Sequence, residues 1–492
     1  MDILLIEPDH KCGIEYFPWG ILAVGSYLRQ QNFDVGLINA SYLLERDFRA
    51  QLFEALPKTR AVGISCFSTD AAFVRDLCAE IKGIRPELQI IVGGPHAVLR
   101  PEQTAAHPDI DFVIHGPGEE PTEQLLTMLG QGNTDFEKVP GICFRRDGRL
   151  IRTPPVGPVP EYRVDYSLLP ANKLATLAEY MEVLSGRGCS FQCTFCYNAV
   201  CGQKWLGKTA DALLDEIDVV LKRYNPHAIN FRDENFFQSK ERILAFLAGY
   251  HERGYTFRWD ATCRASYFTK SYIDEALLQR IAQANCRRLK FGFESGSQRV
   301  LNFLKKGNKV ESYLQVAKLV EGTPIIGSYS FLVGVPTETA EECRQTLALV
   351  RDILDVDPNC EILGPQYYRV YPGGELYNYI LAGGYGYSEP DSFEGWAKVA
   401  RGDYFGLAKG ATHPWIKGFK TLARHADMLV FLARTPINRL LVPRKLLGIP
   451  FALLAKLRLR FRLYALPWDL KLAGALYSRY ASMMLPKSKR SV

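Results

Sequence analysis

Three cysteines stand close together near the middle of the chain, within the segment Gly188–Asn198. They are Cys189, Cys193 and Cys196, and their Cys-x3-Cys-x2-Cys spacing offers three thiolates to one iron–sulfur cluster. Cubane clusters usually take four thiolates, so three ligands leave one iron open. An open iron can bind a small molecule and act on it. The spacing therefore predicts a cluster that takes part in chemistry.

A structural zinc site is the alternative for these cysteines. Structural zinc prefers four ligands, arranged as paired Cys-x2-4-Cys or His spacings. No second pair lies nearby in the sequence, and Cys201 stands alone five residues further on. We interpret Cys201 as an ordinary small apolar residue. The cysteine spacing therefore favours an iron–sulfur cluster over zinc.

Length and composition describe an ordinary globular protein. The 492 residues are enough for two or three domains, and 47% of them are hydrophobic and 23% charged. Twelve cysteines are too dilute for a disulfide scaffold, and residues 1–7 resemble a strand rather than a signal peptide. We therefore expect a cytoplasmic protein whose thiols stay reduced.

The first 140 residues alternate short apolar segments with helical patterns. We expect strands at 3–6, 35–39, 61–65, 89–92 and 112–115, and helices near 21–31, 69–82 and 120–129. Such alternation predicts an α/β domain with a doubly wound parallel sheet. Ligands of these sheets bind beyond the carboxyl ends of the strands.

Three loops at those strand ends are rich in small residues that let a bulky ligand approach the backbone. They cover residues 65–69, 93–96 and 115–119. Together with residues 17–20 they resemble the cobalamin-binding domain that precedes many radical S-adenosylmethionine enzymes. The resemblance implies that cobalamin is bound by Trp19, Ser65, Ser68, Thr69, Gly93, Gly94, Pro95, His96, Gly116, Gly118 and Glu119.

A histidine ligand to cobalt is not expected. Cobalamin domains of the methionine-synthase type carry Asp-x-His-x-x-Gly, and residues 9–13 do not fit that register. His96 and His115 are the other candidates. We interpret His115, at a strand end, as a residue that hydrogen-bonds within its loop. The resemblance therefore predicts cobalt without a protein histidine beneath it and with the dimethylbenzimidazole tail of cobalamin displaced.

The remaining chain divides into three parts. Prolines are dense in residues 141–180, which predicts an extended linker. Strand and helix patterns resume over residues 181–400, with strands expected at 181–184, 228–231, 259–263, 288–293, 325–332 and 361–368. They predict a partial or full α/β barrel, in which chemistry lies at the carboxyl ends of the strands. Residues 401–492 form a basic, mainly helical region.

The cysteine spacing, with an aromatic residue before the third cysteine, resembles the signature of radical S-adenosylmethionine enzymes. In that family the open iron chelates S-adenosylmethionine, and an electron from a 4Fe-4S cluster cleaves the sulfonium to a 5'-deoxyadenosyl radical. Segments 229–236, 291–297, 333–339 and 371–377 extend the resemblance. It implies that S-adenosylmethionine is contacted by Asp233, Glu234, Arg264, Glu294 and Ser295.

Three of these residues have structural alternatives. Asp233 and Glu234 suit the N-cap of a helix as well as a carboxylate that accepts the methionyl ammonium. Arg264 suits a surface salt bridge as well as a contact with the methionyl carboxylate. Glu294 lies in a more specific surround, since glycines at 292 and 296 flank it.

The branch of the family that the chain resembles methylates unactivated carbons or closes rings, and includes hopanoid methylases and the anaerobic porphyrin-ester cyclase. We expect a cobalamin-dependent methyltransferase that acts on a carbon of a small, lipid-like molecule. An electron donor such as flavodoxin or ferredoxin is implied. The alternative is an oxidative cyclase or rearrangement enzyme without net methylation.

The end of the chain is strongly basic. Residues 424–492 hold 14 Lys and Arg against two Asp, so they carry +12 while the whole chain carries +7. No uncharged run there reaches the roughly 20 residues that span a bilayer. Apolar stretches flanked by cations predict a helix in the interface of an anionic membrane. The alternative is a helical cap over the barrel; no nucleic acid partner is expected, because no binding module is recognised.

Overall fold

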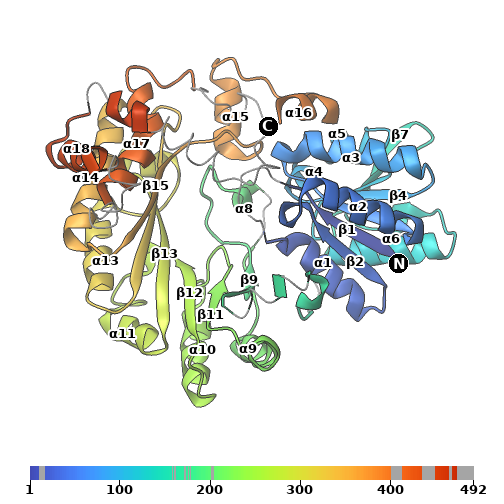
Figure 1. Cartoon of the computed structure of the whole chain (residues 1–492), viewed down its shortest axis with the longest axis horizontal. Helices are drawn as coiled ribbons and strands as arrows, with labels where there is room; N and C mark the ends of the chain where they lie inside the picture. Colours follow the sequence, from blue (N-terminus) through green and yellow to red (C-terminus); the bar gives the residue numbers. More distant parts are fainter. Residues whose placement is uncertain are drawn as a thin grey trace. The chain divides into compact units, whose positions relative to one another are not determined.

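The computed structural model describes residues 1–9, 17–157, 159, 162–170, 173–174, 177, 179–200, 204–400, 413–434, 449–464 and 468–473. The chain divides into two compact units (Figure 1). The first unit comprises Met1–Ala175, Val370–Gly373 and Tyr387–Ala411. The second comprises Thr176–Arg369, Gly374–Gly386 and Thr412–Val492.

The first unit is built on a seven-stranded sheet in the order β2-β1-β3-β4-β5-β6-β7. Five strands are parallel: β1 (Ile3–Glu7), β2 (Val35–Asn39), β3 (Ala61–Ser65), β4 (Gln89–Gly93) and β5 (Phe112–Ile114). All residues of β1 and β3 are buried, as an apolar strand covered on both faces must be. These strands confirm the predicted parallel sheet.

Helices cover this sheet. They are α1 (Trp19–Gln30), α2 (Glu45–Ala55), α3 (Ala71–Ile84), α4 (Pro95–Leu99), α5 (Pro101–Ala105) and α6 (Glu119–Gly130). Helices α1 and α6 pack against each other, and α3 and α5 lie on the other side of the sheet (Figure 1). The three helices predicted near 21–31, 69–82 and 120–129 correspond to α1, α3 and α6.

The predicted linker begins later than expected. Strands β6 (Ile142–Arg146) and β7 (Arg149–Arg152) form a hairpin that adds two antiparallel strands to the sheet beside β5. Asp147 and Gly148 connect them with φ values of 50° and 77°. Two positive φ values define the tight turn that Asp-Gly favours. The Asp-Gly pair was therefore the signal for a hairpin inside the region assigned to the linker.

The barrel region also ends earlier than predicted. Helix α16 (Phe393–Val399) packs against α3 of the first unit. The indole Nε1 of Trp396 donates to Gln103 at 2.7 Å, and Arg75 pairs with Glu394 at 3.0 Å. Residues 387–400 therefore belong to the first unit, although the prediction extended the barrel to residue 400.

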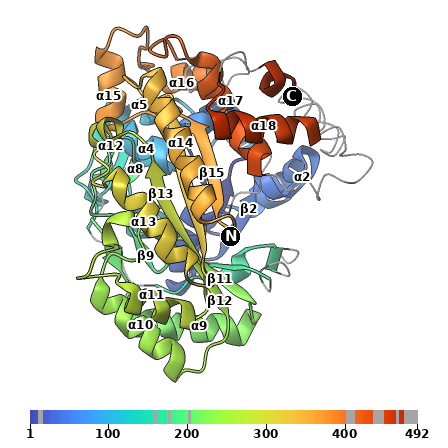
Figure 2. The same ribbon diagram turned by 90° about the vertical axis from the view of Figure 1, so that its left-hand side faces the viewer.

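The second unit holds six parallel strands in the order β15-β14-β13-β12-β11-β8. They are β8 (Met181–Val183), β11 (Ala228–Phe231), β12 (Arg258–Cys263), β13 (Cys286–Glu294), β14 (Ile326–Val333) and β15 (Glu361–Tyr367). Within the described chain β8 and β15 do not pair, so the sheet stays open (Figure 2). The partial barrel of the prediction is confirmed, and a closed barrel is not found.

The helices between these strands begin at well-formed caps. They are α9 (Ala210–Tyr224), α10 (Lys240–Glu252), α11 (Glu275–Gln283), α12 (Gln298–Phe303), α13 (Val310–Glu321) and α14 (Ala340–Val356). In five of them a Thr, Ser or Asp side chain accepts the N–H three residues on: Thr209, Ser239, Asp274, Ser297 and Thr339. Each cap stabilises its helix by about 1 kcal/mol.

The remaining elements of the second unit are shorter or lie at its end. They are β9 (Gly186–Arg187), β10 (Leu206–Gly207), α8 (Tyr197–Val200), α15 (Gly374–Ala382), α17 (Lys420–Arg434) and α18 (Ile449–Phe461). Helices α17 and α18 pack against each other, and α18 also contacts α14. No helix in the described part of the chain is both long and apolar enough to cross a bilayer.

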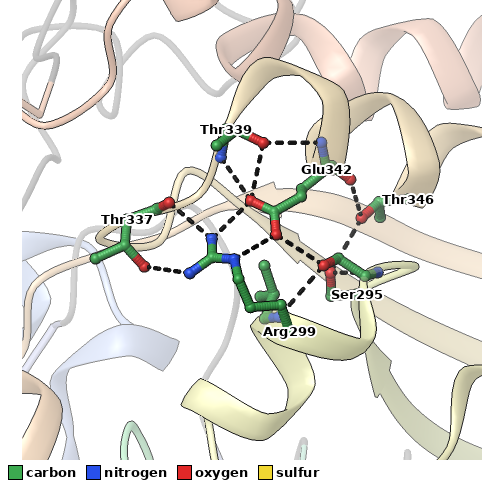
Figure 3. A network of polar contacts seen from close by, with 8 residues as sticks. Ser295, Arg299, Thr337, Thr339, Glu342 and Thr346 are labelled. Carbon is green, nitrogen blue, oxygen red and sulfur yellow. Dashed lines mark hydrogen bonds and ion pairs between the residues drawn. The ribbon is translucent and has the colours of Figure 1, made fainter.

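A polar network joins the loops that follow β13 and β14 (Figure 3). The carboxylate of Glu342 accepts two hydrogen bonds from Arg299, both at 2.6 Å, and others from Ser297 and Thr339 at 2.9 Å. Arg299 also donates to the carbonyl of Thr337 at 2.8 Å. Burial alone would raise the pKa of Glu342, but these hydrogen bonds outweigh it and lower the pKa to about 2.

We predict that Glu342→Gln destabilises the second unit by about 1–2 kcal/mol, because Arg299 loses a charged acceptor. The unfolded carboxyl has a pKa of about 4.3. The stabilisation is therefore complete above about pH 5 and declines as the pH falls through 4 toward 2. Thermal unfolding of wild type and variant between pH 7 and 3.5 should show the difference shrinking with acid.

Glu341→Gln is the matched control, since Glu341 lies in the same turn but its ion pair with Arg344 is exposed. Exposed pairs contribute about 0–1 kcal/mol. Equal destabilisation by the two variants would contradict the role given to Glu342.

Candidate cofactor sites

The cysteine-bearing segment lies at the carboxyl end of β8 and has little secondary structure of its own. Backbone hydrogen bonds of Thr194 hold the segment in place. The N–H of Thr194 donates to the carbonyl of Leu304 at 3.1 Å, and the carbonyl of Thr194 accepts from Leu376 N–H at 3.1 Å. Cys193 is buried, whereas Cys189 and Cys196 are partly exposed. Cys201 lies outside the described residues.

Two side chains donate toward the cysteine sulfurs. Arg264, at the end of β12, places Nη1 3.8 Å from Cys193 Sγ, and its guanidinium carbon lies 3.6 Å from the centre of the Phe191 ring. Asn235 places Nδ2 3.8 Å from Cys189 Sγ. Both side chains thus direct N–H groups at sulfurs of the cysteine segment. The position of neither residue beside a cysteine is readable from the sequence.

Arg264 is therefore an internal residue and not part of a surface salt bridge. It is buried, and Nη2 donates to the carbonyl of Lys306. Its Nε atom is buried without a hydrogen-bond partner among the described residues. A contact of Arg264 with the carboxylate of S-adenosylmethionine stays a prediction.

Glu294 ends β13 and forms a buried ion pair with Lys306, with 2.8 Å between Oε1 and Nζ. Its φ of 65° turns the chain sharply at this point. A Cβ at Gly292 would lie 2.6 Å from Lys306 Nζ and closer still to Glu294 Oε1, so a larger residue there would displace the paired groups. Lys306 also lies 6.0 Å from the ring of Phe195, which precedes Cys196. The pair thus joins the end of β13 to the cysteine segment.

Asp233 and Glu234 hold the start of the same segment. Asp233 is fully buried and accepts from the N–H and hydroxyl of Ser185 at 2.8 and 2.7 Å. Glu234 accepts from Gly188 N–H at 3.1 Å. Burial raises the pKa of Asp233 to about 6, although Arg242 at 3.9 Å opposes the shift.

Neither carboxylate caps a helix, because the N-cap of α10 is Ser239. That structural alternative was wrong, and the physical reason is that both carboxylates are used by the backbone before Cys189. Ser295, too, is fully buried, and its hydroxyl accepts from Ser297 N–H at 3.1 Å. Contacts of Asp233, Glu234, Glu294 and Ser295 with S-adenosylmethionine stay predictions.

The chemistry of the donor set fits an iron–sulfur cluster, whose irons are held by cysteine thiolates. Across the described residues no three His, Cys, Asp or Glu side chains converge closely enough to hold one metal ion. A cubane cluster holds its thiolates farther apart, because each thiolate bonds a different iron. Three thiols lie on one loop, and Arg264 and Asn235 lie beside two of them.

In the first unit, the candidate cobalamin residues lie at the carboxyl edge of the sheet, where β3, β4 and β5 are neighbours. Gly94 has a φ of 89°, and a Cβ there would lie 2.9 Å from the backbone nitrogen of Cys66. The positive φ and the close approach of the Cys66 backbone explain why glycine occupies this position. A Cβ at Gly93, by contrast, would meet nothing within 4 Å, so that position is open to a ligand.

The flanking residues of this edge have mixed environments. Gly118 packs closely, since its Cβ would lie 2.9 Å from Val24, and Gly116 lies near Val156. Trp19 begins α1 with its ring 4.9 Å from that of Phe17. Ser65 and Glu119 are buried, Pro95 begins α4, and Thr69 lies in the short turn Ser68–Asp70. Contacts of these residues with cobalamin stay predictions.

Both histidines of this edge are used inside the unit. His96 is fully buried; its Nδ1 lies 2.8 Å from the Ser68 hydroxyl, and its ring packs against Phe393 and Trp396 of α16. Burial lowers the pKa of His96 to about 3, so its ring is neutral. His115 places Nε2 3.2 Å from the carbonyl of Thr153. His96, which the sequence analysis placed among the cobalamin residues, has a packing role here.

The comparisons with known proteins agree with these two units. A B12 binding domain model matches residues 10–126, and a Radical SAM superfamily model matches residues 183–350. An uncharacterized methyltransferase from Pyrococcus horikoshii is 28% identical over 399 residues, which are 78% of this chain and 83% of that protein. An anaerobic magnesium-protoporphyrin IX monomethyl ester cyclase from Rubrivivax gelatinosus is 25% identical, covering 72% of this chain and 66% of the cyclase.

A solved structure has the same fold. It is the radical S-adenosylmethionine methyltransferase TsrM from Kitasatospora setae, with tryptophan substrate and a SAM analogue bound. The TM-score is 0.68 at 17% identity, and the match covers 88% of this chain and 89% of TsrM. The two family models together account for more than half of the chain. The protein therefore belongs to the cobalamin-dependent radical S-adenosylmethionine enzymes, whose cofactors are cobalamin, S-adenosylmethionine and a 4Fe-4S cluster.

Proposed function

We propose that the protein methylates a carbon atom of a small, lipid-like substrate. The observation that carries this proposal is the union of a B12-binding unit and a radical SAM unit in a chain similar to a methyltransferase over 78% of its length. A cofactor that carries a methyl group and one that removes hydrogen have complementary uses in such a reaction. The similarity to the cyclase of Rubrivivax gelatinosus favours a second candidate, an oxidative cyclisation or rearrangement without net methylation.

The residues divide between binding and positioning. Cys189, Cys193 and Cys196 would bind the cluster, which when bound supplies the electron that cleaves the sulfonium of S-adenosylmethionine. Arg264 and Asn235 direct N–H groups at two of the sulfurs, and the pair Glu294–Lys306 holds the end of β13 against the cysteine segment. The methyl-carrying cofactor would lie on the carboxyl edge of the first unit, at the loops that contain Gly93 and Gly116.

The overall balance of methylation requires an external reductant. One S-adenosylmethionine gives its methyl group and leaves as S-adenosylhomocysteine. A second leaves as methionine and 5'-deoxyadenosine, the latter carrying the hydrogen that the substrate carbon loses. Two sulfonium cations thereby become neutral thioethers, so two electrons enter per turnover. We propose a low-potential donor of the flavodoxin or ferredoxin type, and a cytoplasmic enzyme whose basic end, 424–492, contacts the membrane peripherally.

We predict that anaerobic turnover yields S-adenosylhomocysteine and 5'-deoxyadenosine in equal amounts, with a product 14 Da heavier than the substrate. The two nucleoside products arise from the two molecules of S-adenosylmethionine in the balance above. Mass spectrometry of the reaction mixture measures all three species. 5'-Deoxyadenosine without S-adenosylhomocysteine would favour the cyclase candidate and contradict methylation.

We also predict that alanine at Cys189, Cys193 or Cys196 removes the near-visible absorption of the cluster, the bound iron and all 5'-deoxyadenosine. Each iron that binds one of these thiolates loses its ligand. Cys201→Ala is the control and should keep iron, absorption and product. A Cys201→Ala protein without iron would show that the ligand set has been assigned wrongly.

The environment of the two histidines predicts the spectrum of bound cobalamin. Electron paramagnetic resonance of the cob(II)alamin form should show no nitrogen superhyperfine splitting, because His96 and His115 are engaged inside the first unit and we expect the cofactor's own dimethylbenzimidazole tail to be displaced from cobalt. Splitting that disappears in His115→Ala or His96→Ala would identify that histidine as a cobalt ligand, against this prediction.

A further inference from the structure

The surface of α18 and the residues after it has an unusual composition. Among the described residues of 449–473, every exposed side chain is either apolar or cationic: Pro450, Leu453, Lys456, Leu457, Arg460, Phe461, Arg462, Leu463, Trp468, Lys471 and Leu472. Six of the sixteen large hydrophobic side chains that are exposed in the described chain lie here. Phe461 and Trp468 each expose 63% of their surface. We call these eleven residues the basic–apolar surface.

The helix is already packed on its other side. Ala452, Ala455 and Leu459 are buried, and α18 contacts α14 and α17. A surface helix normally turns its apolar stripe inward and its polar residues outward. Here two alanines face inward beside Arg458 and Leu459, and Leu453, Leu457 and Phe461 form an outward line at intervals of four residues. Packing within the second unit therefore does not explain these three side chains.

The basic–apolar surface has no exposed acidic side chain among its described residues. Asp469 is the one acidic residue of 449–473 in the sequence, and it is buried in a bidentate ion pair with Arg458 at 2.7 and 3.0 Å. Four cations of the segment stay exposed, Lys456, Arg460, Arg462 and Lys471. Arg460 lies 3.3 Å from Asp355, but this pair is exposed and therefore weak. Arg458 is thus an internal residue, whereas its neighbours on the helix can meet an anionic partner.

We propose that the basic–apolar surface docks on an anionic phospholipid membrane. Leucine and phenylalanine side chains of an interfacial helix enter the acyl boundary, while flanking lysine and arginine meet the headgroups. Each such cation contributes about 1 kcal/mol near an anionic surface. Tryptophan prefers the headgroup level, where Trp468 would lie. Lys456 and Arg460, four residues apart, border the line of apolar residues and place charge beside it.

A protein partner fits this surface less well. Protein interfaces are depleted in lysine and carry a polar rim that forms hydrogen bonds. The basic–apolar surface shows no neutral polar side chain and no exposed acid among its described residues. The proposal rests on these residues alone. It stands whether or not the methylation proposed above is correct, although a membrane-bound enzyme is well placed to receive a lipid-like substrate.

The test uses the full-length protein and sedimentation with vesicles. One set contains phosphatidylcholine with phosphatidylglycerol, and the other contains phosphatidylcholine alone. We expect the protein to bind the anionic vesicles at 50 mM salt, to bind the neutral ones at least about tenfold more weakly, and to be released by high salt because exposed charges are screened. Tryptophan fluorescence should shift to the blue on binding, and Trp468→Phe should remove that shift.

Two double variants separate the contributions. Leu457→Ser with Phe461→Ser removes apolar contact, and Lys456→Glu with Arg460→Glu reverses charge; each should weaken binding about tenfold or more. Leu206→Ser with Val219→Ser, two exposed apolar positions elsewhere in the second unit, is the matched control and should bind like the parent. Unchanged circular dichroism will show that each variant is folded.

Several outcomes would overturn the proposal. These are a parent protein that ignores anionic vesicles at low salt, equal binding to neutral vesicles, and surface variants that bind like the parent. A fourth outcome concerns the oligomeric state, which light scattering measures. A dimer of the parent that becomes monomeric in the Leu457→Ser, Phe461→Ser variant would show that a second copy of the chain, and not a membrane, covers the surface.

Discussion

Three thiols must be held in fixed positions on a segment that has almost no secondary structure, and the second unit is organised around this constraint. A loop cannot satisfy its own backbone groups as a helix does. Asp233 and Glu234, which follow β11, accept from the backbone N–H groups of Ser185 and Gly188. Arg264, which follows β12, packs its guanidinium against the ring of Phe191. The end of α12 supplies the carbonyl of Leu304. Loss of any one contact leaves the sulfur positions less defined.

The contacts that hold the cysteine segment include buried charged side chains. Glu294–Lys306 and Asp233–Arg242 are buried ion pairs, and replacing such pairs with apolar residues is often neutral or stabilising. Stability alone therefore does not explain them. Each pair instead fixes a particular geometry, since Lys306 joins β13 to the cysteine segment and Asp233 fixes Ser185 at its start. The network of Glu342 and Arg299 does the same for the loops after β13 and β14.

The elements that sequence predicted well are those with strong local patterns. The apolar strands of both sheets and the cysteine segment after β8 needed only short-range information. The hairpin β6–β7 was hidden by the prolines around it, although Asp147-Gly148 marked its turn. The packing of α16 beside His96 joins residues almost 300 positions apart. The role of Asp233 likewise depends on Ser185, 48 residues away, and no local pattern reports such a partner.

Polar residues at strand ends are predicted to contact ligands, because ligands bind at that edge of a sheet. In both units, however, many of them face inward. His96 packs under α16, Ser295 caps its own turn, and Glu338 accepts the N–H of Gly334 while burial raises its pKa to about 8. A side chain that is buried and hydrogen-bonded inside the unit positions a loop and has few polar atoms left to bind a ligand. Partly exposed thiols such as Cys189 and open backbone such as Gly93 are the positions at which we propose direct contact with the cofactors. Mutations at the inward residues should therefore act through loop geometry, which explains why residue type alone could not separate ligand contacts from their supports.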